Sequence, residues 1–175
     1  MLEPLLKRFW PDEYAASIFD IDYESLYNRG VRGLIFDIDN TIEGYGSPVP
    51  SENACALFKS LADKGFSCCL ASNNAETRVA RFNERLGVPA LHKAGKPGKA
   101  AVSKARAMLG LSDCGENGFA VIGDQVFTDV WMGRRSGVYT VLVKPVTGYD
   151  PWNVALKRLA EGLVLRAYHK KCLKK

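Results

Sequence analysis

The feature that most constrains the fold of this chain is an apolar run that ends in two acidic side chains. Residues 33–38 read Gly-Leu-Ile-Phe-Asp-Ile, and Asp39, Asn40 and Thr41 follow directly. A run of this kind predicts a strand in the interior of a parallel sheet. Side chains two positions apart in a strand point to the same side, so Asp37 and Asp39 can both reach one ligand site at the strand's carboxyl end.

The proximity of two carboxylates has a chemical consequence. Ionised carboxylates in one site repel each other unless a positive charge shares it. A hard cation such as Mg²⁺, together with a phosphate ligand, would resolve that conflict. One carboxylate could then attack phosphorus while the other moves a proton. Asp-x-Asp pairs also serve as helix caps and turns, so this interpretation depends on the rest of the chain.

A second Asp-x-Asp pair illustrates that structural alternative. Asp20 and Asp22 follow no apolar strand, and residues 23–29 lead to Gly30. The pattern is typical of an N-cap, a short helix and a glycine stop. We therefore interpret Asp20 and Asp22 as structural residues.

Strand and helix patterns alternate beyond residue 33. The predicted strands are 33–38, 66–71, 88–91, 119–122 and 138–143, and the predicted helices are 51–64, 74–86, 98–109, a short one before 138 and a last one from Pro151. This alternation predicts an α/β fold, a Rossmann-like parallel sheet with helices on both faces. We expect one domain over residues 1–175, with a helical N-terminal extension (1–30) and a basic C-terminal helix (151–175).

The composition is that of an ordinary globular chain, with 47% hydrophobic and 25% charged residues. We expect a cytoplasmic protein, because the apolar runs are too short for a membrane span and no signal peptide is visible. The five cysteines and two histidines lack the paired spacing of a zinc site. A net charge of +5 favours anionic partners such as phosphorylated substrates, anionic lipid or nucleic acid.

Two further segments place polar residues where an anion could bind. Ser72 and Asn73 follow a predicted strand and precede a helix. The Ser72 hydroxyl and nearby N–H groups suit a phosphate oxygen, although a simple helix cap is the alternative. Lys96 stands just before another helix, where its charge can neutralise a phosphate.

The last such segment follows the predicted strand 119–122. Gly123 lets the backbone pass close, and Asp124 is a natural cation ligand beside Asp37. Asp129 falls in the first turn of the next helix. It can orient water, Lys96 or the metal shell, or it can serve only as a favourable charge at a helix N-terminus.

These segments, in this order, resemble the motifs of the haloacid dehalogenase-like (HAD) superfamily. The chain carries Asp-x-Asp-x-Thr at 37–41, a strand-end serine at Ser72, Lys96, and Gly-Asp-x-x-x-x-Asp at 123–129. The sequence is more similar still to one branch, the YqeG family of HAD IIIA-type phosphatases. The resemblance covers nearly the whole chain, and no motif position departs from it.

The resemblance implies a Mg²⁺-dependent phosphomonoester hydrolase that works through an aspartyl-phosphate. Asp37 would be the nucleophile, and Asp39 the general acid and then the general base. Mg²⁺ would be held by Asp37, the carbonyl of Asp39, and Asp124. The implied phosphate-binding residues are Thr41, which also supports its loop, Ser72, Asn73 and Lys96, and the implied supporting residues are Gly123 and Asp129.

The spacing of the motifs adds an inference about the substrate. The gaps 42–71 and 73–95 are filled by predicted helices and strands, which leaves no room for a large cap domain. An open site suits a large substrate, and members of the wider family around this branch are phosphatidylglycerophosphate phosphatases, so this lipid phosphate is the leading substrate. The alternatives are a phosphatase of a soluble sugar, nucleotide or protein phosphate, and a less favoured non-catalytic HAD-shaped protein that binds RNA or a protein partner.

The C-terminal segment combines apolar residues at helical spacing with many basic ones. The apolar residues are Leu156, Leu159, Ala160, Leu163, Val164 and Ala167, and the basic ones are Lys157, Arg158, Arg166, Lys170, Lys171, Lys174 and Lys175. One interpretation is a helix packed on the domain with a solvated basic tail. The other is a peripheral contact with anionic lipid at the inner face of the membrane.

Overall fold

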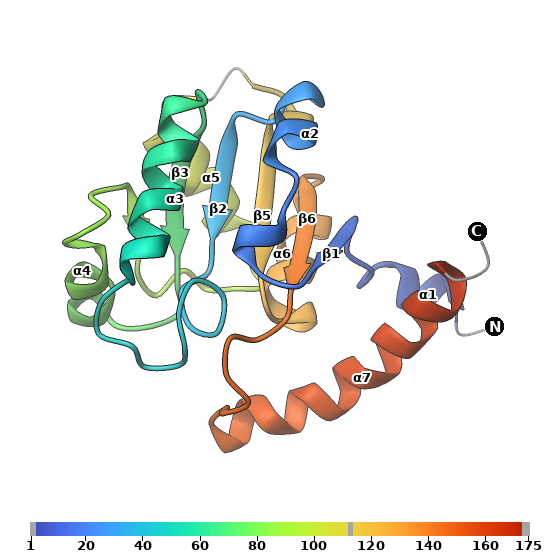
Figure 1. Cartoon of the computed structure of the whole chain (residues 1–175). Helices are drawn as coiled ribbons and strands as arrows, with labels where there is room; N and C mark the ends of the chain where they lie inside the picture. Colours follow the sequence, from blue (N-terminus) through green and yellow to red (C-terminus); the bar gives the residue numbers. More distant parts are fainter. Residues whose placement is uncertain (1–2, 112–113, 173–175) are drawn as a thin grey trace.

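A computed structural model describes residues 3–111 and 114–172, and their strands form one parallel sheet (Figure 1). The order across the sheet is β1-β6-β5-β2-β3-β4. The strands are β1 (Glu13–Ala15), β2 (Gly33–Phe36), β3 (Ser67–Ala71), β4 (Ala90–Leu91), β5 (Phe119–Gly123) and β6 (Tyr139–Val143). Lys174 and Lys175, two of the predicted basic residues, lie outside the described residues.

Helices connect and cover these strands. The α-helices are α1 (Glu3–Lys7), α2 (Tyr23–Asn28), α3 (Glu52–Asp63), α4 (Glu76–Asn83), α5 (Ala100–Met108), α6 (Trp131–Arg135) and α7 (Trp152–Cys172). Two short 3₁₀ helices, η1 (Ile18–Asp20) and η2 (Glu116–Gly118), and a π-helical turn, η3 (Val126–Val130), complete the set. Among the described helices, none combines the length and the apolar character needed to cross a bilayer.

Both faces of the sheet are buried at its centre, which explains why β2 and β5 are apolar at every position. Helices α2, α3 and α4 pack on one face, against Leu34, Phe36, Cys68, Leu70, Ala120 and Ile122. Helices α5 and α6 pack on the other, against Ile35, Cys69, Ala71, Phe119 and Val121. The alternation of these side chains along β2, β3 and β5 confirms the predicted α/β fold with helices on both faces.

The topology creates one natural ligand site. From β2 the chain passes to β3 and β4 on one side, and then returns to β5 and β6 on the other. Strand order therefore reverses between β2 and β5, where open parallel sheets bind ligands at the carboxyl ends of their strands. Residues 37–51, between β2 and α3, form a loop without a domain-sized insertion, in agreement with the absence of a large cap.

The N-terminal region differs from the prediction. We expected residues 1–30 to be helical, but Glu13–Ala15 form β1, which pairs in parallel with β6 at the edge of the sheet. The Asp12 carboxylate holds this edge by accepting hydrogen bonds from the backbone N–H and the hydroxyl of Thr140, both at 2.9 Å. A three-residue strand is too short to show an alternating pattern, so only tertiary contacts define it.

Several local signals in the sequence are confirmed. Asp22 caps α2 by accepting a hydrogen bond from Ser25 N at 2.8 Å, as its structural interpretation predicted. Ser51 caps α3 through Ala54 N at 3.2 Å. Asp20, in η1, accepts a hydrogen bond from the hydroxyl of Ser17, the N-cap residue of that turn.

The long helix α7 crosses one side of the molecule and ends beside α1 (Figure 1). Val164 is its most buried apolar side chain and packs with Val126 and Val130 of η3 and with Leu142 of β6. By contrast, the predicted apolar positions Leu156, Leu159 and Leu163 are 65%, 74% and 63% exposed. The helix therefore packs on the domain through a narrow face and leaves most of its apolar stripe uncovered.

We expect alanine to have opposite effects at two helical glycines. A Cβ at Gly133, in α6, would overlap the Thr140 methyl group, whereas a Cβ at Gly162, in α7, meets nothing within 4 Å. Overpacking should make Gly133→Ala less stable by about 1–3 kcal/mol. Helix propensity should make Gly162→Ala neutral or more stable by up to about 1 kcal/mol. Urea unfolding measures both, and a Gly133→Ala protein as stable as wild type would contradict the described packing of α6.

Candidate active site

Three buried carboxylates meet where β2 and β5 end. Asp37 follows β2 directly, Asp124 follows β5, and Asp129 lies in η3. Their exposed fractions are 8%, 2% and 1%, and one oxygen from each lies within 4.8 Å of the others. Gly123 makes this approach possible, because a Cβ there would overlap the side chain of Asp129.

A buried lysine holds two of these carboxylates together. Lys96 Nζ lies 2.7 Å from Asp37 Oδ1 and 2.7 Å from Asp129 Oδ1. Asn73 fixes the loop that carries the lysine, since its amide accepts a hydrogen bond from Lys96 N at 2.9 Å and donates one to the Lys96 carbonyl at 3.2 Å. Two predicted site residues from separate segments thus position each other.

The cluster is electrostatically costly despite the lysine. Burial raises the pKa of Asp37 to about 6, while the Lys96 ammonium partly opposes the rise and Asp129 adds to it. Burial, followed by repulsion from Asp37 and Asp129, raises the pKa of Asp124 to about 8. Burial alone would lower the pKa of Lys96, but the two carboxylates outweigh it and the pKa is raised.

Asp39 belongs to the same site but has different neighbours. Its carboxylate accepts hydrogen bonds from the Asn74 amide and from Gly46 N, the latter at 2.8 Å. It also pairs with Arg78 Nη2 at 3.0 Å. Asn74 and Arg78 were not predicted as site residues. The Asn-Asn pair after β3 could have pointed to Asn74, but no sequence signal singled out Arg78.

Five of the predicted residues line a cavity of about 240 Å³, whereas Thr41, Gly123, Asp124 and Asp129 are not among its lining residues. Asp37, Asp39, Ser72, Asn73 and Lys96 all line it. The buried Ser72 hydroxyl accepts a hydrogen bond from Asn74 N at 3.2 Å. Ser72 does not cap the next helix, because the residue at the N-cap of α4 is Ala75. The phosphate-binding role of Ser72 stays a prediction, but its simplest alternative is removed.

Thr41 and Asp129 complete the placement of the predicted residues. The Thr41 hydroxyl lies 3.4 Å from Asp124 Oδ1 and so links the loop after β2 to the end of β5. Asp129 Oδ2 accepts a hydrogen bond from Gln125 N at 3.2 Å, while its Oδ1 faces Lys96. Both functions proposed for Asp129, at the helix start and beside the lysine, are therefore compatible.

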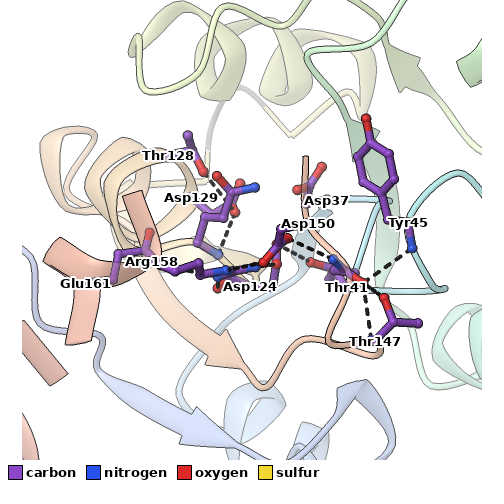
Figure 2. A network of polar contacts seen from close by, with 12 residues as sticks. Asp37, Thr41, Tyr45, Asp124, Thr128, Asp129, Thr147, Asp150, Arg158 and Glu161 are labelled. Atoms are coloured by element: carbon purple, nitrogen blue, oxygen red, sulfur yellow. Dashed lines mark hydrogen bonds and ion pairs between the residues drawn. The ribbon is translucent and has the colours of Figure 1, made fainter. Parts of the chain in front are cut away.

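The sequence did not reveal the contribution of α7 to this site (Figure 2). Arg158 reaches inward, where its guanidinium pairs with the Asp124 carboxylate and donates to the Asp124 carbonyl at 2.6 Å. It also pairs with Asp150 at 3.0 Å and with buried Glu161 at 3.2 Å. From the sequence, Arg158 is expected among basic residues that face solvent or anionic lipid, and both interpretations are wrong for this residue.

Asn40 is a second unpredicted organiser. Its φ of 59° is left-handed, which asparagine tolerates better than most residues. Its side-chain carbonyl accepts a hydrogen bond from the Thr147 hydroxyl at 2.7 Å, and its amide donates to Asp150 at 3.0 Å. Asn40 thereby ties the loop after β2 to the segment that leads into α7. Its position inside the Asp-x-Asp-x-Thr motif was the available signal.

The donor set of the carboxylate cluster fits a hard divalent cation. Asp37, Asp124 and Asp129 offer oxygen ligands only, and their mutual repulsion would be relieved by a positive ion. Within the described residues, this group is the one cluster of acidic, histidine or cysteine side chains with that geometry.

Comparisons with known proteins agree with this geometry. Residues 93–148 match a family model described as HAD-hydrolase-like. The chain is 39% identical over 170 residues to the Probable phosphatase YqeG of Bacillus subtilis (strain 168). This alignment covers 95% of this chain and 96% of that protein. It is 30% identical over 161 residues to the chloroplastic phosphatidylglycerophosphate phosphatase 1 of Chlamydomonas reinhardtii, covering 86% of this chain and 59% of that longer protein.

A solved structure supports the fold. The cobalt-bound deoxy-D-mannose-octulosonate 8-phosphate phosphatase YrbI of Haemophilus influenzae aligns with a TM-score of 0.50 and 15% identity, over 81% of this chain and 91% of that one. A parallel sheet that brings these motifs to one cavity defines a HAD-like hydrolase. Within that class the chain belongs to the YqeG family and is a phosphatase. HAD phosphatases generally use a divalent metal ion, in keeping with the carboxylate cluster.

We expect Mg²⁺ to stabilise the folded protein through this cluster. A ligand at a hundredfold excess over its Kd adds about 2.7 kcal/mol to the free energy of unfolding. The melting temperature of the wild-type protein should therefore increase with Mg²⁺ concentration. The Asp124→Asn protein should need at least tenfold more Mg²⁺ for the same increase in melting temperature. Asp63→Asn, at the exposed end of α3, is the matched control. An identical Mg²⁺ dependence for Asp124→Asn and wild type would contradict the ligand assignment.

Proposed function

We propose that the protein is a Mg²⁺-dependent phosphomonoesterase that forms an aspartyl-phosphate on Asp37, with phosphatidylglycerophosphate as its leading substrate. The observation that carries the proposal is the contact of Lys96 with Asp37 inside a cavity that also contains Asp39 and Ser72. A carboxylate, a cation and a second carboxylate within one cavity are the groups that phosphoryl transfer needs.

The first half-reaction transfers the phosphoryl group to the enzyme. Asp37 Oδ1 is held by Ile38 N at 2.8 Å and by Lys96, which leaves Oδ2 for attack on phosphorus. The new bond joins Oδ2 to phosphorus as the bond from phosphorus to the ester oxygen breaks. Asp39, protonated when substrate binds, gives its proton to the leaving oxygen. Lys96 and the Ser72 hydroxyl bind the phosphoryl oxygens, and Asn73 keeps the lysine in place.

The second half-reaction regenerates Asp37. Asp39, now a carboxylate, takes a proton from water as that water attacks phosphorus, and the bond from phosphorus to Asp37 breaks to release phosphate. The contacts from Arg78 and Asn74 keep Asp39 oriented for both proton transfers. Asp37, Asp124 and the carbonyl of Asp39 would hold Mg²⁺, which would supply positive charge to offset the carboxylates and the transferring group.

Two observations support a lipid phosphate as the substrate. No domain-sized cap follows β2, so the cavity does not exclude a phosphate attached to a large molecule. The relative from Chlamydomonas reinhardtii is named as a phosphatidylglycerophosphate phosphatase. A peripheral contact of α7 with anionic membrane would bring the cavity to such a substrate.

We expect Asp37→Asn to abolish turnover while the fold is retained. An amide is a poor nucleophile and a poor metal ligand, so Mg²⁺-dependent phosphate release should fall by at least a thousandfold, on the order of the loss of a catalytic nucleophile. Asp20→Asn changes the exposed, structural Asp-x-Asp pair and should leave turnover close to wild type. Retained turnover in a folded Asp37→Asn protein would remove Asp37 from its proposed role.

A phosphate-release screen should identify the substrate class. Phosphatidylglycerophosphate in mixed micelles is compared with sugar, nucleotide and phosphopeptide esters, each with Mg²⁺ and with chelator. We expect the highest kcat/KM for the lipid and no activity with chelator. Rapid hydrolysis of a soluble ester, with the lipid left intact, would reject the lipid substrate and keep the phosphatase mechanism.

A further inference from the structure

The outward face of α7 is an uncovered apolar stripe. Trp152, Leu156, Leu159 and Leu163 are 82%, 65%, 74% and 63% exposed. Their spacing of four, three and four residues places them on one side of the helix. Large apolar side chains in such a row are uncommon on a surface that faces only water.

The opposite side of α7 already has partners. Val164 is buried against η3 and β6, Glu161 accepts a hydrogen bond from Phe127 N at 3.2 Å, and Arg158 reaches Asp124. These contacts fix the rotation of the helix about its axis. The stripe is therefore held outward by the same residues that join α7 to the site.

The charges of α7 indicate what covers the stripe. Lys157, Arg166 and Lys170 are exposed, and helical geometry places Arg166 and Lys170 at the far end of the stripe. The one carboxylate of the helix, Glu161, is only 2% exposed. An outer face that is apolar and cationic, without exposed carboxylates, complements an anionic bilayer surface. Two copies of this face would offer each other no opposite charge.

The first turns of α7 also border the active site, on the side of the helix opposite the stripe. Pro151, Val154 and Lys157 line the cavity that contains Asp37. Tyr149, just before the helix, is 66% exposed and contacts the ring of Tyr45, another cavity residue, at 5.9 Å between centroids. A surface that covers the stripe is therefore separated from the cavity by the width of α7.

We propose that the outer face of α7, defined by Trp152, Leu156, Leu159 and Leu163 with Arg166 and Lys170, seats the protein on an anionic bilayer. The apolar side chains enter the interface between headgroups and acyl chains, while the two cations contact lipid phosphates. Seated in this way, the protein holds its cavity on the other side of α7, one helix diameter (roughly 10 Å) from the membrane surface, which keeps Asp37 near a lipid phosphomonoester. This arrangement helps catalysis only if the substrate is the proposed lipid phosphate. The binding of the protein to vesicles does not depend on that substrate.

Vesicle binding by the full chain tests the surface. Sedimentation is measured with phosphatidylcholine vesicles, with or without about one third phosphatidylglycerol. We expect binding to the anionic vesicles that weakens with salt. Leu159→Gln with Leu163→Gln should lower the partition coefficient at least tenfold, because it removes apolar contacts while keeping good helix formers. Met108→Gln, at an exposed apolar position of α5, is the matched control and should bind as wild type.

Tryptophan fluorescence tests the orientation of the helix. Trp152 is the exposed tryptophan on the stripe, so its emission should shift to shorter wavelength when anionic vesicles are added. Trp152→Phe should still sediment with vesicles but should lose most of that shift. Light scattering of the wild-type protein and the double glutamine variant then reports whether the stripe joins two copies of the chain.

The outcomes separate this proposal from the proposed function. Three results would each overturn the docking surface. The wild-type protein does not bind vesicles, or the double glutamine variant binds them as well as wild type does. In the third, the wild-type protein is a dimer that does not bind vesicles, and the double glutamine variant is a monomer. Hydrolysis of p-nitrophenyl phosphate should be unchanged in the double variant. Loss of vesicle binding in that variant, with no hydrolysis of lipid phosphate by wild type, would retain the surface and reject the lipid substrate.

Discussion

The structure depends above all on the buried ammonium of Lys96 between Asp37 and Asp129. Without this cation the carboxylates of Asp37, at the end of β2, and Asp129, in η3, could not share a buried site, because each would lose its water without gaining a partner. Lys96 lies 2.7 Å from both, so a single charge joins the loop after β2, the loop before α5 and the turn η3. The same contact prepares the site for phosphate, since a positive charge already faces the proposed nucleophile.

Arg158 provides a second, analogous compensation. It pairs with Asp124, Asp150 and Glu161, and so connects the remaining carboxylate of the cluster to α7. The buried side of α7 is thus specified by charge as much as by apolar contact, which leaves its leucines free to face outward. The site and the proposed docking surface are linked physically, because the residues that orient Asp124 also orient the stripe.

The parts of the molecule that could be predicted from the sequence are those with local causes. The apolar runs of β2, β3 and β5 and the caps at Asp22 and Ser51 were readable because each depends on nearby residues. Strand β1 was missed because a three-residue edge strand exists only through its pairing with β6. Arg158 was missed because a basic residue in a basic helix looks like solvent-exposed charge, and only the tertiary fold turns it toward Asp124.

The central claim, that Asp37 carries the phosphoryl group, is tested most directly by trapping the covalent intermediate. Asp39→Asn should still accept a phosphoryl group from p-nitrophenyl phosphate, whose good leaving group needs little acid catalysis, but should release it slowly for want of a general base. Acid quenching within the first turnover, followed by peptide mass spectrometry, should find the phosphate on Asp37. Phosphorylation of another residue, or a burst of p-nitrophenol with no adduct on the chain, would contradict the account.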